Sequence, residues 1–295
     1  HVVYVWLDAL TNYITNIGFD VDNENDEFKK LWPADLHLIG KDIIRFHTIY
    51  WPCFLWSLDL ELPKKVFGHP WLLTSSDKMS KSKGNVIYAD DLVDMFGLDA
   101  VRFYLLHEIP FANDGNITYD LLIERINGEL ANVLGNLVQR TISMGNKYFD
   151  GKVTNKKVNE ELDETFIDSI NKLDSLVDAK MDELQIADAI TEIFNVLRAS
   201  NKYIDDTMPW SLAKEEDKKD RLETVLYNLL ESIRVCGAML EAFMPDTSSS
   251  ILKQINISDT SYEFNDNNSY ELGQPTPLFQ RIDRDKFLAE HGIEV

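Results

Sequence analysis

The sequence predicts an α/β segment followed by an all-α helix bundle. Up to about residue 110, short apolar runs rich in β-branched and aromatic residues alternate with helical patterns, which is typical of β-α units around a parallel sheet. From about residue 118 onward, apolar residues recur at the spacing of an amphipathic helix. These two patterns predict two domains, residues 1–115 and 116–295.

Three apolar runs of the first segment are candidate strands: residues 2–6, 36–39 and 65–68. A helical pattern follows each of the first two, and the second of these helices is expected at about 41–57, where the residues are amphipathic and aromatic. In parallel sheets, ligands bind where the carboxyl ends of the strands meet the loops. Any site in this segment should therefore lie at those strand ends.

The second segment begins with a long helix, expected at about residues 119–146 from the stripe that runs from Leu122 to Leu137. Residues 258–277 are polar, rich in Asn and Ser, and punctuated by glycine and proline, which predicts a loop before a short final segment. Further apolar stripes at helical spacing are Ile170, Leu173 and Val177; Ile186, Ile190, Ile193 and Leu197; and Leu222, Leu226, Leu229, Ile233 and Leu240.

Composition indicates a globular protein. The 295 residues, 44% hydrophobic and 27% charged, suffice for one large domain or two ordinary ones. No run of about 18 apolar residues occurs and no basic leader precedes an apolar stretch, so a cytoplasmic protein without membrane contact is expected. Cys53 and Cys236 stand singly in apolar surroundings, so they alone build neither a disulfide framework nor a zinc knuckle.

The net charge of −21 argues against general attraction to a polyanion, because nucleic-acid affinity comes largely from neutralised phosphates. Any RNA contact must then be a local basic patch. The chain begins at His1 and enters an apolar run at once, with no start methionine. We therefore expect it to be a fragment of a longer protein.

Residues 74–85 have the composition of a mobile phosphate clamp: Lys78, Lys81 and Lys83 are separated by small hydroxyl residues, and Gly84 follows. When a carboxylate attacks the α-phosphate of ATP, charge builds on the departing pyrophosphate, so ammonium groups that reach it favour the transition state. The alternative is that a lysine-rich surface turn serves only solubility. A P-loop is excluded, because Gly40-Lys41-Asp42 lacks both the earlier glycine and the Ser/Thr that the motif requires.

Residues 78–82, Lys-Met-Ser-Lys-Ser, are similar in all five letters to the second signature motif of class I aminoacyl-tRNA synthetases. This resemblance implies that residues 1–115 are the second half of a Rossmann-type nucleotide fold. It also implies that Lys78 and Lys81 stabilise the triphosphate of ATP during adenylate formation and that Ser80 joins the ATP site. Magnesium is expected with the triphosphate.

Residues 4–13, Tyr-Val-Trp-Leu-Asp-Ala-Leu-Thr-Asn-Tyr, resemble the strand-to-helix junction of methionyl-tRNA synthetases. By this resemblance Trp6, Ala9 and Tyr13 border a methionine pocket. Aromatic walls with one weak polar contact suit a soft, polarizable thioether. The sequence departs from some family members at Leu10 and Asn12, where others have a proline and a glycine.

Residues 38–47 read as a strand, a glycine turn and the start of a helix. Gly40 allows close backbone approach, and the carboxylate of Asp42 can accept hydrogen bonds from ribose hydroxyls. The resemblance places these two positions against the adenosine of ATP and His47 beside the methionine side chain. As alternatives, Asp42 is a helix N-terminal charge and His47 a packed, satisfied histidine.

The remaining tryptophans and histidines of this segment are assigned no ligand. His37, His69 and His107 show no metal-like spacing, and we interpret the indole side chains of the first segment outside Trp6 as packing residues. Those indole side chains are Trp32, Trp51, Trp56 and Trp71.

On the long helix, Asn136 and Arg140 are four residues apart and project together beside the apolar stripe. Methionyl-tRNA synthetases contact the anticodon bases through an asparagine and an arginine with this Asn-Leu-x-x-Arg spacing and stack a base on a later Pro-Trp pair, which Pro209 and Trp210 resemble. Splayed bases of RNA loops are read by such stacking and edge contacts. The alternative is an ordinary helix start at Pro209, a buried indole at Trp210 and an indifferent surface amide at Asn136.

The resemblance implies a methionine-tRNA ligase, which forms methionyl-adenylate from methionine and ATP and transfers the methionyl group to tRNA(Met). The family's other signature, a His-x-Gly-His element, is absent from these residues, so the isolated chain is expected to be inactive and zinc is expected only in the missing part. Three alternatives stay open: a tRNA-binding or packing module without catalysis, a leucyl or valyl synthetase, and a nucleotidyltransferase unrelated to tRNA.

Overall fold

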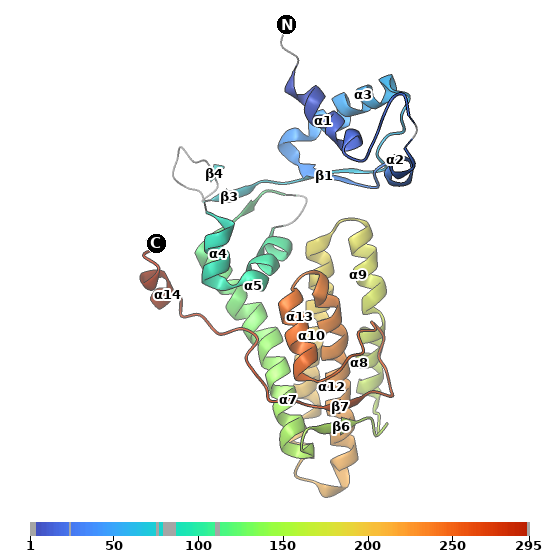
Figure 1. Ribbon diagram of the computed structural model, residues 1–295. Helices are drawn as coiled ribbons and strands as arrows, with labels where there is room; N and C mark the ends of the chain where they lie inside the picture. Colours follow the sequence, from blue (N-terminus) through green and yellow to red (C-terminus); the bar gives the residue numbers. More distant parts are fainter. Residues whose placement is uncertain (1–3, 24, 75–76, 79–86, 110–112, 294–295) are drawn as a thin grey trace. The chain divides into compact units, whose positions relative to one another are not determined.

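The computed structural model describes residues 4–23, 25–74, 77–78, 87–109 and 113–293. The chain divides into two compact units: residues 1–72 with 111–115, and residues 73–110 with 116–295. Residues 73–110, which the sequence predicted in the first domain, therefore belong to the second unit. Each unit is described below by itself (Figure 1).

The first unit contains the predicted parallel strand pair. β1 (His37–Gly40) pairs in parallel with β2 (Val66–His69), close to the expected ranges. β1 leads into a 3-10 turn, η1 (Lys41–Ile43), and then into a helical run that ends at Ser57, as predicted. This run consists of η2 (Phe46–Tyr50), which is π-helical, and α3 (Trp51–Ser57), and the unit further contains α1 (Val5–Thr15) and α2 (Asp26–Leu31).

The predicted strand at residues 2–6 is wrong where the structure describes it. Tyr4 is extended, but α1 begins at Val5 and includes Trp6. The reason is packing: Leu10 and Ile14 are buried and Trp6 packs against the same small core, so residues four apart form a helical stripe. A five-residue apolar run is compatible with both a strand and a helix. Burial of Leu10 and Ile14 in the core favours the helix here.

Residues 73–110 pack with the helical part because two side chains of one short helix bind the ends of two distant helices. Asp99 accepts a hydrogen bond from the backbone N–H of Thr247 at 2.6 Å, in the first turn of α13. Arg102 donates to the carbonyl oxygens of Ala242 and Phe243, just beyond the end of α12. Each charge matches the dipole of the helix end it contacts. The elements involved are α4 (Ala89–Phe96), α5 (Leu98–Phe103), the π-helical η4 (Tyr104–Glu108), α12 (Lys219–Met239) and α13 (Pro245–Gln254).

The predicted long helix is present as one continuous helical run from Tyr119 to Phe149. Thr118 caps its start by accepting a hydrogen bond from the backbone N–H of Leu121 at 3.2 Å. Its three parts are α6 (Tyr119–Arg125), the π-helical η5 (Ile126–Gly135) and α7 (Asn136–Phe149).

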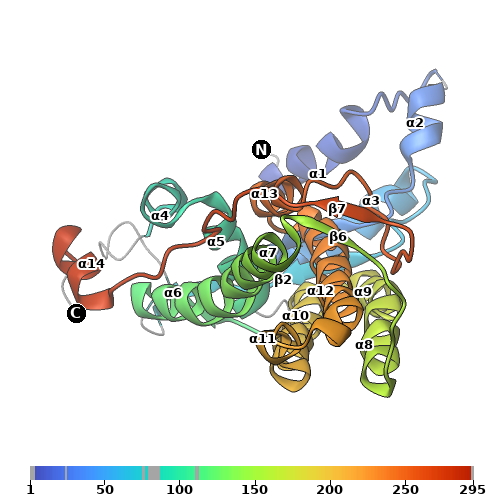
Figure 2. The same ribbon diagram turned by 90° about the horizontal axis from the view of Figure 1, so that it is seen from below.

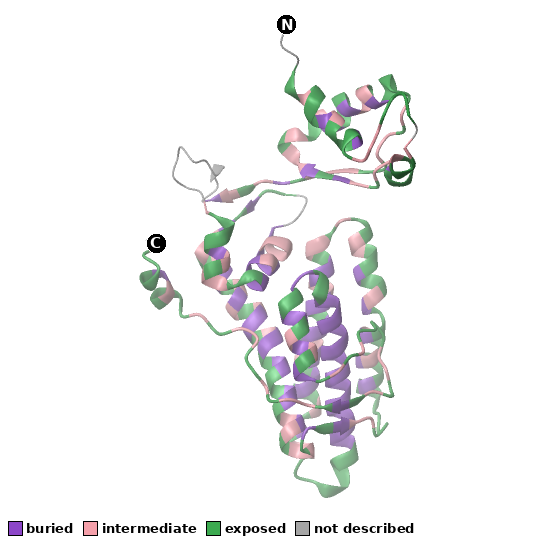
Figure 3. Ribbon diagram, viewed as in Figure 1, coloured by how far each residue is buried: buried purple, intermediate pink, exposed green. Residues whose placement is uncertain are grey.

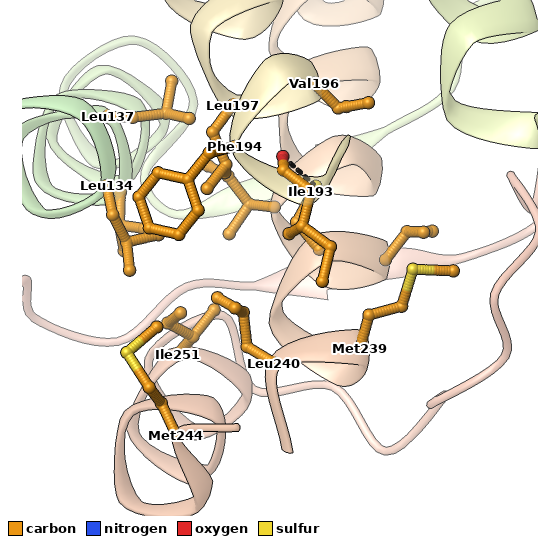
Figure 4. Close-up of a cluster of buried hydrophobic side chains, with 14 of the residues drawn as sticks. Leu134, Leu137, Ile193, Phe194, Val196, Leu197, Met239, Leu240, Met244 and Ile251 are labelled. Carbon is orange, nitrogen blue, oxygen red and sulfur yellow. Dashed lines mark hydrogen bonds between the residues drawn. The ribbon is translucent and has the colours of Figure 1, made fainter. Parts of the chain in front are cut away.

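α12 is the centre of the second unit. All residues from Arg221 to Leu240 are buried, so the helix is covered on every side (Figure 3). The helices around it, side by side in Figures 1 and 2, are α7, α8 (Glu161–Asn171), α10 (Ile186–Thr207) and α13, and α9 (Leu173–Asp182) packs on α10. The side chains that meet in this core (Figure 4) include Leu134, Leu137, Ile193, Phe194, Leu197, Met239, Met244 and Ile251.

The second unit is not all-helical, contrary to the prediction. β6 (Lys152–Thr154) pairs antiparallel with β7 (Ser269–Glu271), and β7 lies inside the predicted loop 258–277. Tyr270 anchors β7, because its hydroxyl donates to the buried carboxylate of Glu231 on α12. A buried side-chain partner, rather than a local sequence pattern, thus makes this strand.

The remaining elements are short. Of the residues that the structure describes, no helix is long and apolar enough to cross a membrane. A small sheet has the strand order β4-β3-β5, and the other short elements are the helix that follows α10 and a helix near the C-terminus. Their bounds are β3 (Leu72–Thr74), β4 (Asp77–Lys78), β5 (Gly115–Asn116), α11 (Pro209–Leu212) and α14 (Arg284–Glu290).

Candidate functional site

The first unit joins Tyr13 on α1 to His47 on η2. The hydroxyl oxygen of Tyr13 lies 2.9 Å from Nε2 of His47, and Nδ1 of His47 lies 3.0 Å from the carbonyl oxygen of Ile43. A carbonyl oxygen only accepts, so in the neutral ring Nδ1 carries the hydrogen and Nε2 accepts from the hydroxyl of Tyr13. Burial raises the pKa of Tyr13, which keeps that hydrogen in place.

Trp6 lies against the same cluster. Its ring stacks on Phe46 with centroids 4.0 Å apart and planes 9° apart, and it meets His47 edge-on at 6.2 Å. Ala9 is exposed on α1, three residues after Trp6 and four before Tyr13, so all three share one helix face. The structure therefore brings together the four residues that the sequence assigned to one pocket.

His37 and Trp51 complete this cluster, although sequence reasoning gave His37 no role and interpreted Trp51 as packing. Both are buried; Trp51 Nε1 donates to His37 Nε2 at 3.2 Å, and the rings of His37 and Tyr13 are 4.5 Å apart. Burial, and secondarily the nearby His47, lowers the pKa of His37 to about 4, so the ring is neutral at pH 7. His37 had no signal in the sequence, because the apolar Leu38 is exposed and only the structure shows that His37 and Ile39 share the buried face of β1.

Gly40 and Asp42 lie at the carboxyl end of β1, where the sequence placed them. A Cβ at Gly40 would lie 2.6 Å from Oδ1 of Asp42, so only glycine leaves room for this carboxylate to fold back over the strand end. The side chain of Asp42 is exposed and faces solvent at the edge where ligands of parallel sheets bind. The geometry leaves this carboxylate accessible to a hydroxyl-bearing ligand.

Lys41, between these two residues, is already engaged. Its ammonium pairs with Asp114 and lies 4.3 Å from the ring centroid of Trp71, whose backbone N–H also donates to Asp114 at 3.0 Å. The hydrogen bond from Lys41, and secondarily that from Trp71, lowers the pKa of Asp114. Asp114 therefore stays charged as the ionic partner of Lys41.

The lysine loop is the one predicted site element that the structure does not show. The backbone of Lys78 closes β4, paired with Leu73 of β3, but its side chain lies outside the described residues. Ser80 and Lys81 lie outside the described residues altogether.

In the second unit, contacts between α10 and the long helix fix the flank that carries Asn136 and Arg140. Arg198 pairs with Glu129 at 2.7 Å, Asn201 donates to the carbonyl oxygen of Val133 at 3.0 Å, and Asp205 lies 3.9 Å from the guanidinium of Arg140. In these three pairs the residue numbers increase along both helices. α10 and the long helix therefore run side by side in the same direction (Figure 1). Asn136 and Arg140 are exposed one turn apart on this flank.

Pro209 and Trp210 continue this flank. Met208 adopts a left-handed conformation that ends α10, and Pro209 then starts α11 with its ring buried. The Trp210 side chain is 42% exposed, five residues beyond Asp205, the residue that faces Arg140. The four residues predicted to contact RNA thus lie on neighbouring elements, with an indole, an amide and a guanidinium accessible to solvent.

Comparison with known proteins assigns both parts of the chain. Residues 1–142 match the family described as tRNA synthetases class I (M), and residues 153–285 match the anticodon binding domain of methionyl tRNA ligase. Curated relatives named methionine--tRNA ligase include those of Caldanaerobacter subterraneus subsp. tengcongensis, 49% identical over 98% of this chain, and Clostridium acetobutylicum, 50% identical over 98%. The chain covers 46% of each of these two relatives, and so spans about half their length.

Solved structures agree. The methionyl-tRNA synthetase of Mycobacterium tuberculosis in complex with methionyl-adenylate superposes with a TM-score of 0.88 at 39% identity, covering 95% of this chain and 56% of that one. The free enzyme from the same organism gives a TM-score of 0.85 at 36% identity. The fold is therefore that of a class I synthetase catalytic fragment followed by a mostly helical domain. With both family matches joined along one chain, this protein belongs to the methionyl-tRNA synthetase family of class I aminoacyl-tRNA synthetases.

Proposed function

We propose that this chain forms part of a cytoplasmic methionine-tRNA ligase, which activates methionine with ATP and transfers the methionyl group to tRNA(Met). The observation that carries the proposal is the cluster of Trp6, Tyr13 and His47, in which two aromatic rings and one oriented polar pair converge on a helix face. Such a surface suits an unbranched thioether, which binds through dispersion contacts and one weak polar contact. A 39% identical relative was solved with methionyl-adenylate, which supports the same ligand here.

ATP is proposed to bind at the end of β1. Gly40 gives the backbone close access to the nucleotide, and the exposed Asp42 accepts hydrogen bonds from the ribose hydroxyls. In this proposal residues 1–115 are the second half of a Rossmann-type catalytic domain, in which β1 and β2 are two strands of a larger parallel sheet. Magnesium accompanies the triphosphate and neutralises its charge.

Lys78 and Lys81 are proposed to stabilise the pyrophosphate as it leaves, with Ser80 in the same site. The support is the five-letter motif at residues 78–82 within a chain of this family. Ammonium groups aimed at the departing oxygens act most strongly in the transition state, where the charge is largest.

The helical domain, residues 116–295, is proposed to be a helix bundle that reads the anticodon. Trp210, which follows the buried Pro209 at the start of α11, offers a stacking surface, and Asn136 and Arg140 offer hydrogen bonds to the edges of splayed bases. These groups form a local site within a chain of net charge −21, so affinity should depend on base contacts more than on general attraction.

Two measurements test the proposal. In the complete enzyme that contains these residues, ATP-pyrophosphate exchange should depend on methionine and not on leucine or valine; exchange with either of those would assign a different synthetase. The chain itself should bind a methionine tRNA and lose affinity for one with a swapped anticodon. Binding of tRNA by a complete enzyme that shows no exchange would instead identify an RNA-binding module.

A further inference from the structure

A small pocket lies where residues 73–110 meet the helical part of the second unit. Here α5 and α13 lie side by side (Figures 1 and 2). The pocket has a volume of about 280 Å3 and is lined by Asp99 of α5 and by Asp246 and Ser250 of α13. The apolar side chains on its wall include Phe96, Leu278 and Phe279. Two carboxylates thus face the same space as an apolar surface.

One carboxylate oxygen of Asp99 has no partner in the part of the chain that the structure describes. Asp99 is only 6% exposed; its Oδ2 accepts from the backbone N–H of Thr247, whereas its Oδ1 is buried without a hydrogen bond. Arg102, one turn later on α5, donates to the carbonyl oxygens of Ala242 and Phe243 instead. A buried carboxylate oxygen is costly without a partner, so this atom calls for a positive charge nearby.

The helix ends at the pocket compensate its two carboxylates only in part. Asp99 and Asp246 stand in the first turns of α5 and α13, and a helix N-terminus carries roughly half a positive charge. Two carboxylates against two such ends leave about one negative charge. Neither carboxylate forms an ion pair with a residue among those described. The electrostatics of the pocket therefore favour a ligand that carries positive charge.

We propose that this pocket binds a small aliphatic amine. Its ammonium group, which has three donors and no acceptor, meets the exposed carboxylate of Asp246 directly, and the buried Oδ1 of Asp99 acts on it through its charge. Its hydrocarbon chain lies against Leu278 and Phe279, a surface from which a bare metal ion gains nothing.

The size of the pocket limits the amine to a short chain, because sites for drug-sized ligands measure roughly 300–1,000 Å3. The position of the pocket suggests what the amine does. Asp99 ties residues 73–110 to the first turn of α13, so a ligand that neutralises its charge stabilises this junction. The proposal is independent of the function proposed above.

The test measures binding of 1,4-diaminobutane to the complete protein that contains these residues, by isothermal titration calorimetry at fixed ionic strength. Asp246→Asn should raise Kd about tenfold, the loss of one charge-assisted hydrogen bond. Glu241→Gln is the matched control: Glu241 is exposed five residues earlier, does not line the pocket, and its replacement removes the same charge. Its Kd should equal that of the unmodified protein.

Two further probes separate the charge from the chain. 1,4-Butanediol, which has the same chain without charge, should not bind, and ammonium chloride, which has the charge without the chain, should bind at least about tenfold more weakly than the diamine. Asp99→Asn can still accept from Thr247 and should also weaken binding of the diamine. Its melting temperature without ligand shows whether the variant is folded.

Each other outcome overturns the proposal in a recognisable way. Equal Kd values for Asp246→Asn and Glu241→Gln would mean that the diamine is attracted generally to a chain of net charge −21. Binding of ammonium chloride as tight as that of the diamine would mean that the apolar wall plays no part. If the diamine does not bind to the unmodified protein, the pocket is not an amine site, while the function proposed above is unaffected.

Discussion

The hydroxyl of Tyr13 and the imidazole of His47 form a hydrogen bond whose direction is set by a third group. Because Nδ1 of His47 lies against the carbonyl oxygen of Ile43, the neutral ring can only accept at Nε2. The helix backbone thus fixes the tautomer of a buried histidine, and the histidine fixes the rotation of a tyrosine on another helix. An aromatic wall positioned in this way can discriminate ligands by shape without rearranging.

Tyr13→Phe should weaken this site while keeping the ring. The buried Nε2 of His47 would lose its donor, and an unsatisfied buried acceptor costs about 1–3 kcal/mol. We expect a lower melting temperature for the chain and, in the complete enzyme, a higher KM for methionine with a smaller change in kcat. Tyr4→Phe, at an exposed position of the same unit, should change neither. Equal behaviour of the two variants would remove the hydroxyl of Tyr13 from the site.

The buried His37 should make stability depend on pH. Its pKa is about 4 in the folded chain against 6.5 for an exposed histidine, so between these values the unfolded chain binds a proton that the folded chain does not. The contribution of His37 is therefore present in full above pH 6.5 and is lost as pH falls toward 4, by on the order of 3 kcal/mol.

Urea unfolding between pH 7 and pH 4 measures this effect. His37→Gln cannot gain the proton and can still accept from Trp51, so its free energy of unfolding should fall less steeply with pH than that of the unmodified chain. His291→Gln, at an exposed position, is the control and should keep the original slope. If His37→Gln also kept that slope, His37 would not be the group that titrates.

Lys81→Ala tests the motif in the complete enzyme. In the proposed function Lys81 stabilises the leaving pyrophosphate, so removing its ammonium should lower the rate of ATP-pyrophosphate exchange about a hundredfold. Methionine binding, measured by equilibrium dialysis, should stay unchanged, because the aromatic cluster at Trp6 and Tyr13 is intact. Lys172→Ala, at the cap between α8 and α9 and outside the motif, should leave exchange as it was. Near-normal exchange by Lys81→Ala would exclude Lys81 from the mechanism.

The elements that the sequence predicted are those with a sustained local period. β1 and β2 follow from short apolar runs that end in a glycine turn, and the helix from Tyr119 to Phe149 follows from its long apolar stripe. β7 was not predicted, because three residues are too few to show a period. Its position depends instead on the hydrogen bond from the hydroxyl of Tyr270 to Glu231. The attachment of residues 73–110 to the helical unit depends likewise on Asp99, whose partner lies 148 residues away.

The same distinction applies to the site. Residues with a recognisable motif, such as Trp6 and Asn136, could be proposed as site residues from the sequence alone. His37 was not, because its importance lies in contacts with Trp51 and Tyr13, which only the fold brings together. The groove beside Gln139 was not predicted for the same reason: its other wall comes from residues 277–281, more than a hundred residues later in the chain.

Trp210→Ala should separate the two activities of the enzyme. Losing one stacked base costs about 1–3 kcal/mol, so binding of tRNA(Met) and aminoacylation should both weaken, while adenylate formation stays intact. Trp56→Ala is the matched control, an indole that is 65% exposed on the first unit. Unchanged charging by Trp210→Ala would show that Trp210 only supports the fold.

The buried pair of Asp163 and Arg221 should be the most sensitive point of the helical unit. Asp163 on α8 accepts two hydrogen bonds from Arg221 on α12, at 2.7 and 3.0 Å, and a third from the hydroxyl of Tyr203 on α10. Burial and this carboxylate raise the pKa of Tyr203 well above its usual range, so the tyrosine stays a donor. One carboxylate thus ties three helices together.

Asp163→Ala would remove the buried carboxylate that pairs with Arg221 and would leave the guanidinium only the more exposed Glu160 as an ionic partner, which should cost up to about 3–5 kcal/mol. We expect a lower urea midpoint for unfolding, and a comparable loss is not expected for Asp168→Ala, whose partner Lys172 is exposed on the same helix. Because Asp163 lies in the core, away from the exposed flank of Arg140 and Trp210, RNA binding should persist in whatever fraction stays folded. An equal midpoint for both variants would mean that packing of α8 against α12, and not this ion pair, holds the two helices together.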